Sequence, residues 1–152
     1  MHDEPVERPP AVPVLVVDDN CGFLRVVRAV LEGGEPSFSV HTVETGQQAL
    51  ALLDRIAPFE EAPRPAFIVL DYHLHDLDAP DVLQQMATRP GLGAIPVLVL
   101  SVAGWEQDQA AALAAGAVRF SEKPSRVGPL RDLLVTFWKE HVDGGQSPGH
   151  RG

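Results

Sequence analysis

Three apolar runs that each end on a polar side chain constrain this chain more than any other feature of its sequence. Residues 14–17, 67–70 and 97–100 are apolar, and they are followed by Asp18 with Asp19, by Asp71 and by Ser101. Such runs are typical of strands buried on both faces of a parallel sheet. The carboxyl ends of parallel strands share one edge, where open α/β folds hold their ligands. We therefore expect three acids and one hydroxyl to converge on a site for a cation and a phosphate group.

Strand-like and helix-like patterns alternate along the chain. Strands are expected at residues 14–17, 37–43, 66–71, 97–101 and 117–121, each followed by apolar residues at helical spacing. Thr45, Asp78 and Ser125 are the expected caps of the second, third and fifth helices. The alternation predicts an α/β fold with a parallel sheet and helices on both faces. We expect the flavodoxin-like option, a doubly wound five-stranded sheet in the order 2-1-3-4-5. The fourth helix, near residues 107–115, has mostly alanine on its inner side, so we expect it to be weakly anchored.

Length and composition fit one globular domain between two short termini. The chain has 152 residues, of which 45% are hydrophobic, enough to bury a core without disulfides. Residues 1–12 are expected to be a flexible proline-rich lead-in, residues 13–142 the domain, and residues 143–152 a disordered tail. The segmentation therefore places every candidate functional residue inside a single domain.

Charge and hydropathy exclude several classes of partner and location. The formal net charge is −9, and no basic stripe offsets it, which argues against binding to nucleic acid. No apolar stretch approaches the length of a membrane span, and the amino terminus lacks the apolar centre of a secretion signal. The single cysteine, Cys21, excludes an internal disulfide and fits a reducing compartment. We therefore expect a cytoplasmic protein without a membrane partner.

Several short motifs occur in a fixed order, each at the end of a different expected strand. They are Asp18-Asp19 after the first strand, Asp71 after the third, Ser101 after the fourth, and Phe120 with Lys123-Pro124 after the fifth. Each motif alone is common, but all of them at their own strand ends form a specific pattern. With these residues the chain resembles the receiver domain of two-component response regulators, over about residues 13–141.

The resemblance implies a phosphoacceptor and a magnesium site. Asp71 would accept a phosphoryl group from a histidine kinase or a phosphotransfer protein. Asp19 and Asp71 would ligate Mg²⁺, Asp18 would help through a bound water, and the backbone carbonyl of His73 would complete the protein ligands. Elementary chemistry agrees, because Mg²⁺ is a hard cation that prefers carboxylate, carbonyl and water oxygens.

The resemblance also implies a switch that reaches the protein surface. Lys123 and Ser101 would contact phosphoryl oxygens, and Ser101 with Phe120 would move between two states. The movement would reshape the surface made by the fourth helix, the fifth strand and the fifth helix. That surface would bind an unknown downstream protein, and it could also form a homodimer. Such a domain is a signalling protein and not an enzyme, although it can catalyse its own phosphorylation and dephosphorylation.

Three residues depart from the family pattern and leave an alternative open. His75 stands where proline is common, Ala79 where glycine is common, and Val102 where alanine or glycine is common. The turn must close without its usual residues, and a branched side chain stands beside the expected phosphoryl pocket. The chain is therefore either a phosphorylatable receiver or a receiver-like interaction module that works without phosphorylation.

An enzyme reading is weaker. A Mg²⁺-dependent phosphatase of the haloacid dehalogenase class would use Asp71 as its nucleophile, but those proteins carry Asp-x-Asp, whereas Asp71 is followed by Tyr72 and His73. A transition-metal site is a further reading of one cluster, formed by His73, His75, Asp76 and Asp78.

Simpler readings exist for single residues. Taken alone, Asp18 and Asp19 are equally explained as solvated residues or as a cap for the first helix. Ser101 alone fits a loop hydroxyl, Phe120 a core aromatic, and Cys21 a small residue in the first turn of a helix. Only their combination favours the functional reading.

Overall fold

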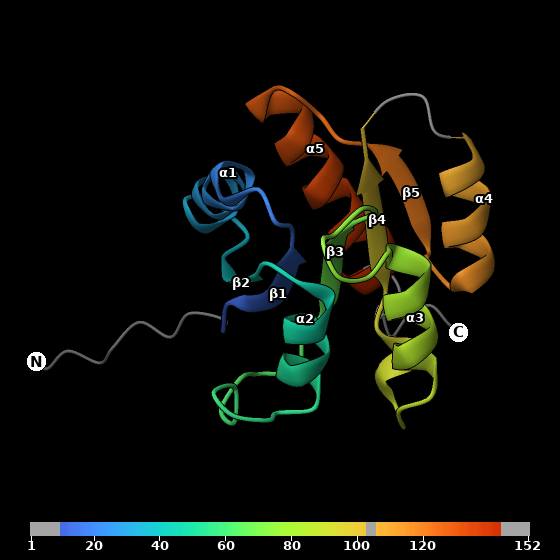
Figure 1. Cartoon of the computed structure of the whole chain (residues 1–152). Coiled ribbons are helices and arrows are strands. Elements are labelled where there is room, and N and C mark those ends of the chain that lie inside the picture. The colour runs from blue at the N-terminus through green and yellow to red at the C-terminus, as the bar shows by residue number, and fades with distance from the viewer. Residues whose placement is uncertain (1–9, 103–105, 144–152) are drawn as a thin grey trace, which may run out of the picture.

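The computed structural model describes residues 10–102 and 106–143, and in them the sheet has the predicted order (Figure 1). Five parallel strands run in the order β2-β1-β3-β4-β5. The strands are β1 (Val12–Val17), β2 (Phe38–Val43), β3 (Phe67–Asp71), β4 (Val97–Ser101) and β5 (Arg119–Glu122). The helices are α1 (Cys21–Glu32), α2 (Gly46–Leu53), α3 (Ala79–Ala87), α4 (Glu106–Ala115) and α5 (Val127–Trp138). The doubly wound α/β prediction is confirmed for this part of the chain.

Side chains alternate between two cores, one on each face of the sheet. Val14 and Val16 of β1 point into a core that α1 and α5 cover, whereas Leu15 and Val17 point into a core that α2, α3 and α4 cover. This alternation follows from the two-residue period of a strand. Because both faces are covered, the central strands can be apolar throughout, as the sequence predicted.

Local polar side chains begin the first three helices. Asn20 accepts a hydrogen bond from the Phe23 N–H at 3.0 Å at the start of α1, and Thr45 accepts one from the Gln48 N–H at 3.0 Å at the start of α2. Asp78 is the N-cap residue of α3, as predicted. The reading of Asp18 or Asp19 as the cap of α1 is wrong, because Asn20 occupies that position.

The expected start of the fifth helix is also wrong. The N-cap position of α5 is Arg126, with no side-chain hydrogen bond, and Ser125 lies one residue earlier. A serine before an apolar helical pattern is a common cap, but here the turn after β5 extends one residue further. The fifth strand is likewise displaced toward the C-terminus, at Arg119–Glu122 in place of residues 117–121.

Helix α4 is weakly anchored, as its alanine-rich sequence predicted. Ala112 is its one buried residue, and α4 contacts α3 and β5 through small side chains. Little bulky apolar area opposes a shift of this helix.

Residues 1–9, 103–105 and 144–152 lie outside the described residues, so most of the expected lead-in and tail is not covered. Within the described residues, no helix combines the length and apolar character that crossing a membrane requires.

Candidate functional site

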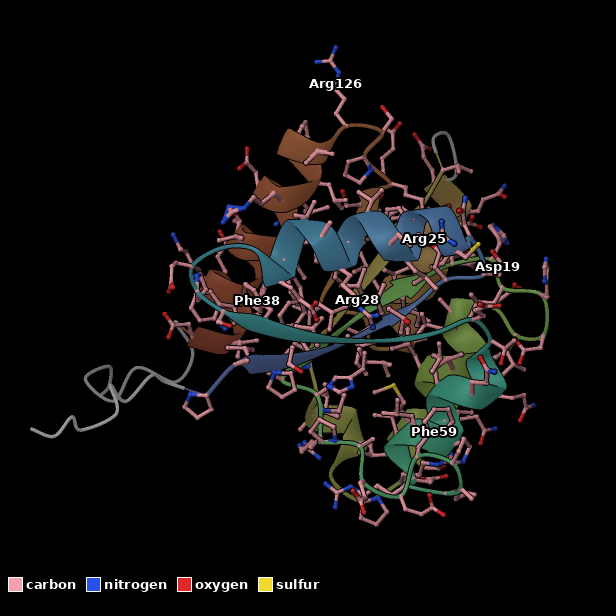
Figure 2. All side chains as sticks on the ribbon, turned by 90° about the vertical axis from the view of Figure 1, so that its left-hand side faces the viewer. Asp19, Arg25, Arg28, Phe38, Phe59 and Arg126 are labelled. Atoms are coloured by element: carbon pink, nitrogen blue, oxygen red, sulfur yellow. The ribbon has the colours of Figure 1, made fainter. Side chains whose placement is uncertain are left out.

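The three acids predicted from the strand ends meet at one edge of the sheet. Asp18 and Asp19 follow β1, and Asp71 is the last residue of β3. One carboxylate oxygen from each lies within 4.8 Å of the others. Figure 2 shows Asp19 at the end of α1 that lies away from Phe38, which places the cluster at the carboxyl end of β1. The predicted convergence of these acids is therefore confirmed.

Burial separates the roles that the three carboxylates can play. Asp18 is 1% exposed and accepts a hydrogen bond from the Asn20 N–H at 2.9 Å, so its position is fixed. The side chains of Asp71 and Asp19 remain 13% and 23% exposed. Asp71 and Asp19 are therefore accessible to solutes, whereas Asp18 is the buried member of the cluster.

Lys123 supplies the cation that the sequence predicted beside these acids. Its Nζ lies 2.6 Å from Asp18 Oδ2 and 3.6 Å from Asp71 Oδ1. The backbone N–H of Lys123 donates to the Ser101 carbonyl at 2.6 Å, which holds the residue at the end of β5. The ammonium also lies 4.3 Å from the centre of the Phe23 ring, a stabilising cation–π contact. Lys123 is thus held between the buried acid and the accessible one.

The surroundings of Asp71 raise the pKa of its carboxyl group. Burial, together with the negative charges of Asp18 and Asp19, raises the pKa of Asp71 to about 6, although Lys123 opposes the shift. Three carboxylates confined to this volume repel one another, and a bound cation would relieve that repulsion. The cluster is therefore poised to capture a divalent cation.

The donor set fits magnesium. All three clustered donors are carboxylate oxygens, the type that Mg²⁺ prefers, and partial exposure of two of them leaves room for the waters that this ion retains. The His73 backbone carbonyl, the fourth predicted ligand, lies two residues beyond Asp71 in the loop before α3.

Ser101 and Phe120 are the two residues that we expect to move when Asp71 is modified. Ser101 is 1% exposed, and its Oγ is buried without a hydrogen-bond partner among the described residues. A buried hydroxyl without a partner is costly, so a phosphoryl oxygen beside it would be stabilised. Phe120 is partly buried and contacts Tyr72 edge-on, with ring centres 6.5 Å apart. Ser101 is thus a buried residue at the end of β4, and Phe120 packs against the edge of the core.

The loop between β3 and α3 closes without the glycine that is common in it. Ala79 is the first residue of α3, is fully buried, and donates its N–H to the Tyr72 carbonyl at 2.9 Å. His73 and Asp78 form an antiparallel bridge across the loop. Because residue 79 adopts a helical conformation, it does not need the freedom of glycine.

His73 connects this loop to α4, a contact that the sequence did not predict. Its Nε2 lies 2.9 Å from Asp108 Oδ2, and its ring packs against that of Tyr72 with centres 4.6 Å apart. Asp108 carried no signal in the sequence, because its partner depends on how α4 lies beside the loop. A second unpredicted contact joins His75 to Asp19.

The alternative reading of His73, His75, Asp76 and Asp78 as a transition-metal site does not hold for the four residues as a set. Asp76 turns away and accepts hydrogen bonds from the N–H groups of Gly46 and Gln47 at the start of α2, at 2.9 and 2.8 Å. Burial alone would raise the pKa of Asp76, but these hydrogen bonds hold it below its usual value. Alternate residues of the loop face different partners, so their ligand atoms do not gather at one point.

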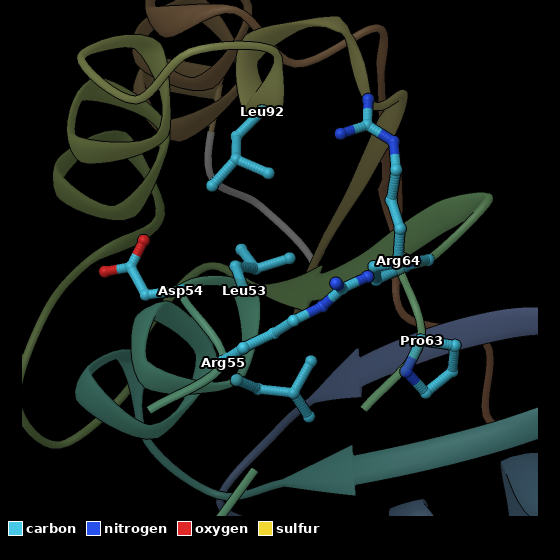
Figure 3. A pocket seen from close by; sticks show the side chains of 8 residues that line it. Leu53, Asp54, Arg55, Pro63, Arg64 and Leu92 are labelled. Carbon is cyan, nitrogen blue, oxygen red and sulfur yellow. The ribbon is translucent and has the colours of Figure 1, made fainter. Parts of the chain in front are cut away.

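A cavity of about 200 Å³ lies apart from the carboxylate cluster, between α2 and the segments before β3 and β4 (Figure 3). Leucines and two arginines contribute to its lining, which consists of Leu52, Leu53, Asp54, Arg55, Pro63, Arg64, Pro65 and Leu92. No member of the candidate site lines it. This cavity is therefore separate from the candidate site.

Comparison with known proteins agrees with this geometry. The response regulator receiver domain family matches residues 14–135. The response regulator Rcp1 of Synechocystis sp. is 30% identical over 145 residues, which cover 93% of this chain and 97% of Rcp1. The structure of the phosphorylated cyanobacterial phytochrome response regulator RcpA has a TM-score of 0.80 at 25% identity and covers 91% of this chain and 99% of that one. The Mn²⁺-bound form of Rcp1 has a TM-score of 0.75 at 26% identity, with 87% and 95% covered.

The fold and the acidic edge define a signalling domain of the two-component class. With the family match over most of its length, this chain belongs to the response regulator receiver domain family. A phosphorylation site and Mg²⁺ are typical of that family.

Proposed function

We propose that this chain is a phosphorylatable receiver in which Asp71 accepts a phosphoryl group from a histidine kinase or a phosphotransfer protein. The observation that carries the proposal is the cluster of Asp18, Asp19 and Asp71 with the Lys123 ammonium 3.6 Å from the Asp71 carboxylate. In this proposal the chain is a signalling protein that does not turn over a substrate. We also propose that it acts in the cytoplasm.

The transfer uses the accessible carboxylate as the nucleophile. An Asp71 oxygen attacks phosphorus while the bond from phosphorus to the donor's histidine nitrogen breaks, and the electron pair stays on that nitrogen. Asp19, Asp71 and the His73 carbonyl would hold Mg²⁺, with Asp18 helping through a water, and the ion would supply charge neutralisation for the phosphoryl oxygens. Lys123 leaves its partial contact with Asp71 to bind a phosphoryl oxygen, and it keeps Asp18 as its other partner.

The same event drives the proposed switch. The Ser101 hydroxyl, buried and without a partner among the described residues, donates to a phosphoryl oxygen and moves toward Asp71. Phe120, whose ring contacts that of Tyr72, follows into the vacated space. Weakly anchored α4 then shifts at low energetic cost.

The output surface is formed by α4, β5 and α5, which surround the β5 edge of the sheet in Figure 1. Leu113, Val118 and Val127 are exposed apolar residues of α4, the turn before β5 and the start of α5. Exposed apolar residues of this kind suit a protein partner, either a downstream target or a second copy of the chain.

Phosphoryl labelling tests the proposal. The protein is incubated with acetyl phosphate or a phosphoramidate, with and without Mg²⁺, and its intact mass is measured. We expect a gain of one phosphoryl group that requires Mg²⁺ and is lost in Asp71→Asn. No labelling of the folded protein would favour the interaction-only receiver, and steady turnover of a generic phosphate ester would favour the phosphatase.

A further inference from the structure

We propose that the imidazole of His75 is an additional ligand of the metal site and makes it prefer first-row transition ions over Mg²⁺. The inference rests on the proposed function only in that Asp18, Asp19 and Asp71 must bind a divalent cation. It adds a residue that stands where proline is common in this family.

The first support is the contact that His75 makes. Its Nε2 lies 3.3 Å from Asp19 Oδ2, and Asp19 is one of the three clustered carboxylates. The imidazole thus stands at the rim of the oxygen cluster, on the side of Asp19. A small rotation of a side chain that is 85% exposed would bring the nitrogen to an ion held by that carboxylate.

The second support is that the backbone carrying the ring is fixed. Leu74, the preceding residue, is buried in the core. Asp76, the following residue, accepts hydrogen bonds from the N–H groups of Gly46 and Gln47. His75 is therefore held beside Asp19 by anchors on both sides, although its own ring is in solvent.

The third support is that the two loop histidines have different surroundings. The ring of His73 is engaged by Asp108 and packs on Tyr72, so it faces α4. The ring of His75 instead faces the carboxylates. Of the two imidazoles, His75 is the one placed to serve the metal site.

The chemical consequence is a change in ion preference. Mg²⁺ takes oxygen ligands in a near-ideal octahedron and gains little from an imidazole. Manganese and the later first-row ions accept imidazole nitrogen readily, with affinity rising along the Irving–Williams order. With Asp19 and Asp71 as direct ligands and Asp18 acting through a water, an added imidazole nitrogen therefore makes the site discriminate against Mg²⁺ more than oxygen ligands alone would.

The test uses Mn²⁺, whose electron spin reports nitrogen ligands directly. Pulsed electron paramagnetic resonance of the untagged protein with Mn²⁺ should show modulation from a coordinated ¹⁴N nucleus. The signal should vanish in His75→Gln and persist in the matched control His41→Gln, since His41 lies on β2 with Ser39 as its neighbour. Calorimetric titration should show about a tenfold loss of Mn²⁺ affinity in His75→Gln with Mg²⁺ affinity changed less than about twofold.

The outcomes separate this inference from the proposed function. If Mn²⁺ and Mg²⁺ bind the wild type but no ¹⁴N modulation is seen, or the modulation survives in His75→Gln, the role of His75 is overturned and the metal site stands. Tighter Mn²⁺ binding by His75→Gln would also overturn it, because the ring would then be a competitor. If neither ion binds the wild type, the metal site itself fails.

Discussion

Replacing Asp71 with Asn should stabilise the metal-free protein at neutral pH, although it removes the proposed functional group. The pKa of Asp71 is raised from 3.8 to about 6, mainly by burial and then by the charge of Asp18. Because the folded state binds this proton more tightly than the unfolded state, the stability of the wild type falls as the pH rises from about 4 through about 6. Because asparagine stays neutral, the variant does not lose this stability as the pH rises.

The size of the gain in stability follows from the shift in the pKa of Asp71. A difference between 3.8 and about 6 corresponds to about 3 kcal/mol in the free energy of unfolding, as an upper estimate. The gain should be nearly absent near pH 3.5, grow across about pH 4 to 6, and stay constant above about pH 7. Such a gain is a large fraction of the 5–15 kcal/mol or so that stabilises a typical domain.

Urea denaturation of both proteins across this pH range, without Mg²⁺, measures the gain. The exposed residue Asp132 on α5 offers a matched control, and Asp132→Asn should change stability little at any pH. Saturating Mg²⁺ should narrow the gap between wild type and Asp71→Asn, because the ion binds only the folded wild-type site well. A gap that is independent of pH, or an Asp71→Asn protein less stable than the wild type at pH 7, would refute the reasoning.

Three further substitutions test other parts of the site. Lys123→Gln leaves the buried Asp18 carboxylate without its cation, so the free energy of unfolding should fall by about 3 kcal/mol in denaturation without Mg²⁺. Added Mg²⁺ should restore part of this loss. No recovery would contradict the view that the ammonium and the ion both neutralise the same carboxylates. Asp108→Asn weakens the contact between α4 and His73, so amide hydrogen exchange in α4 should become faster while exchange in α1 is unchanged. Val102 directly follows Ser101 in the chain and is exposed, so Val102→Ala removes a branched side chain next to that buried residue. The substitution should speed phosphoryl exchange in a time course with a small phosphodonor; equal rates would show that Val102 does not hinder access.

Much of the fold could be predicted because burial on both faces leaves a plain trace in the sequence. The central strands are apolar over almost their whole length, and the alternation of strands and helices implies a parallel sheet with both faces covered. The cluster of Asp18, Asp19 and Asp71 could be predicted for the same reason, since the ends of parallel strands meet at one edge.

Contacts between loops and helices could not be predicted. The contacts of His73 with Asp108 and of His75 with Asp19 each join an exposed histidine to a partly buried acid far away in the chain. Only the packing of α4 and the closure of the β3–α3 loop bring these residues together. The start of α5 was misplaced because Ser125 and Arg126 differ by one residue in a turn, which local propensity resolves poorly.

The central claim is that the phosphoryl group is carried by the side chain at the end of the third strand. After incubation with a phosphodonor and Mg²⁺, borohydride reduction converts an aspartyl phosphate to homoserine, which peptide sequencing by mass spectrometry locates. Homoserine at position 71 is the result this account predicts. Homoserine at Asp18 or Asp19, or a labelled protein with aspartate intact at position 71, would contradict it.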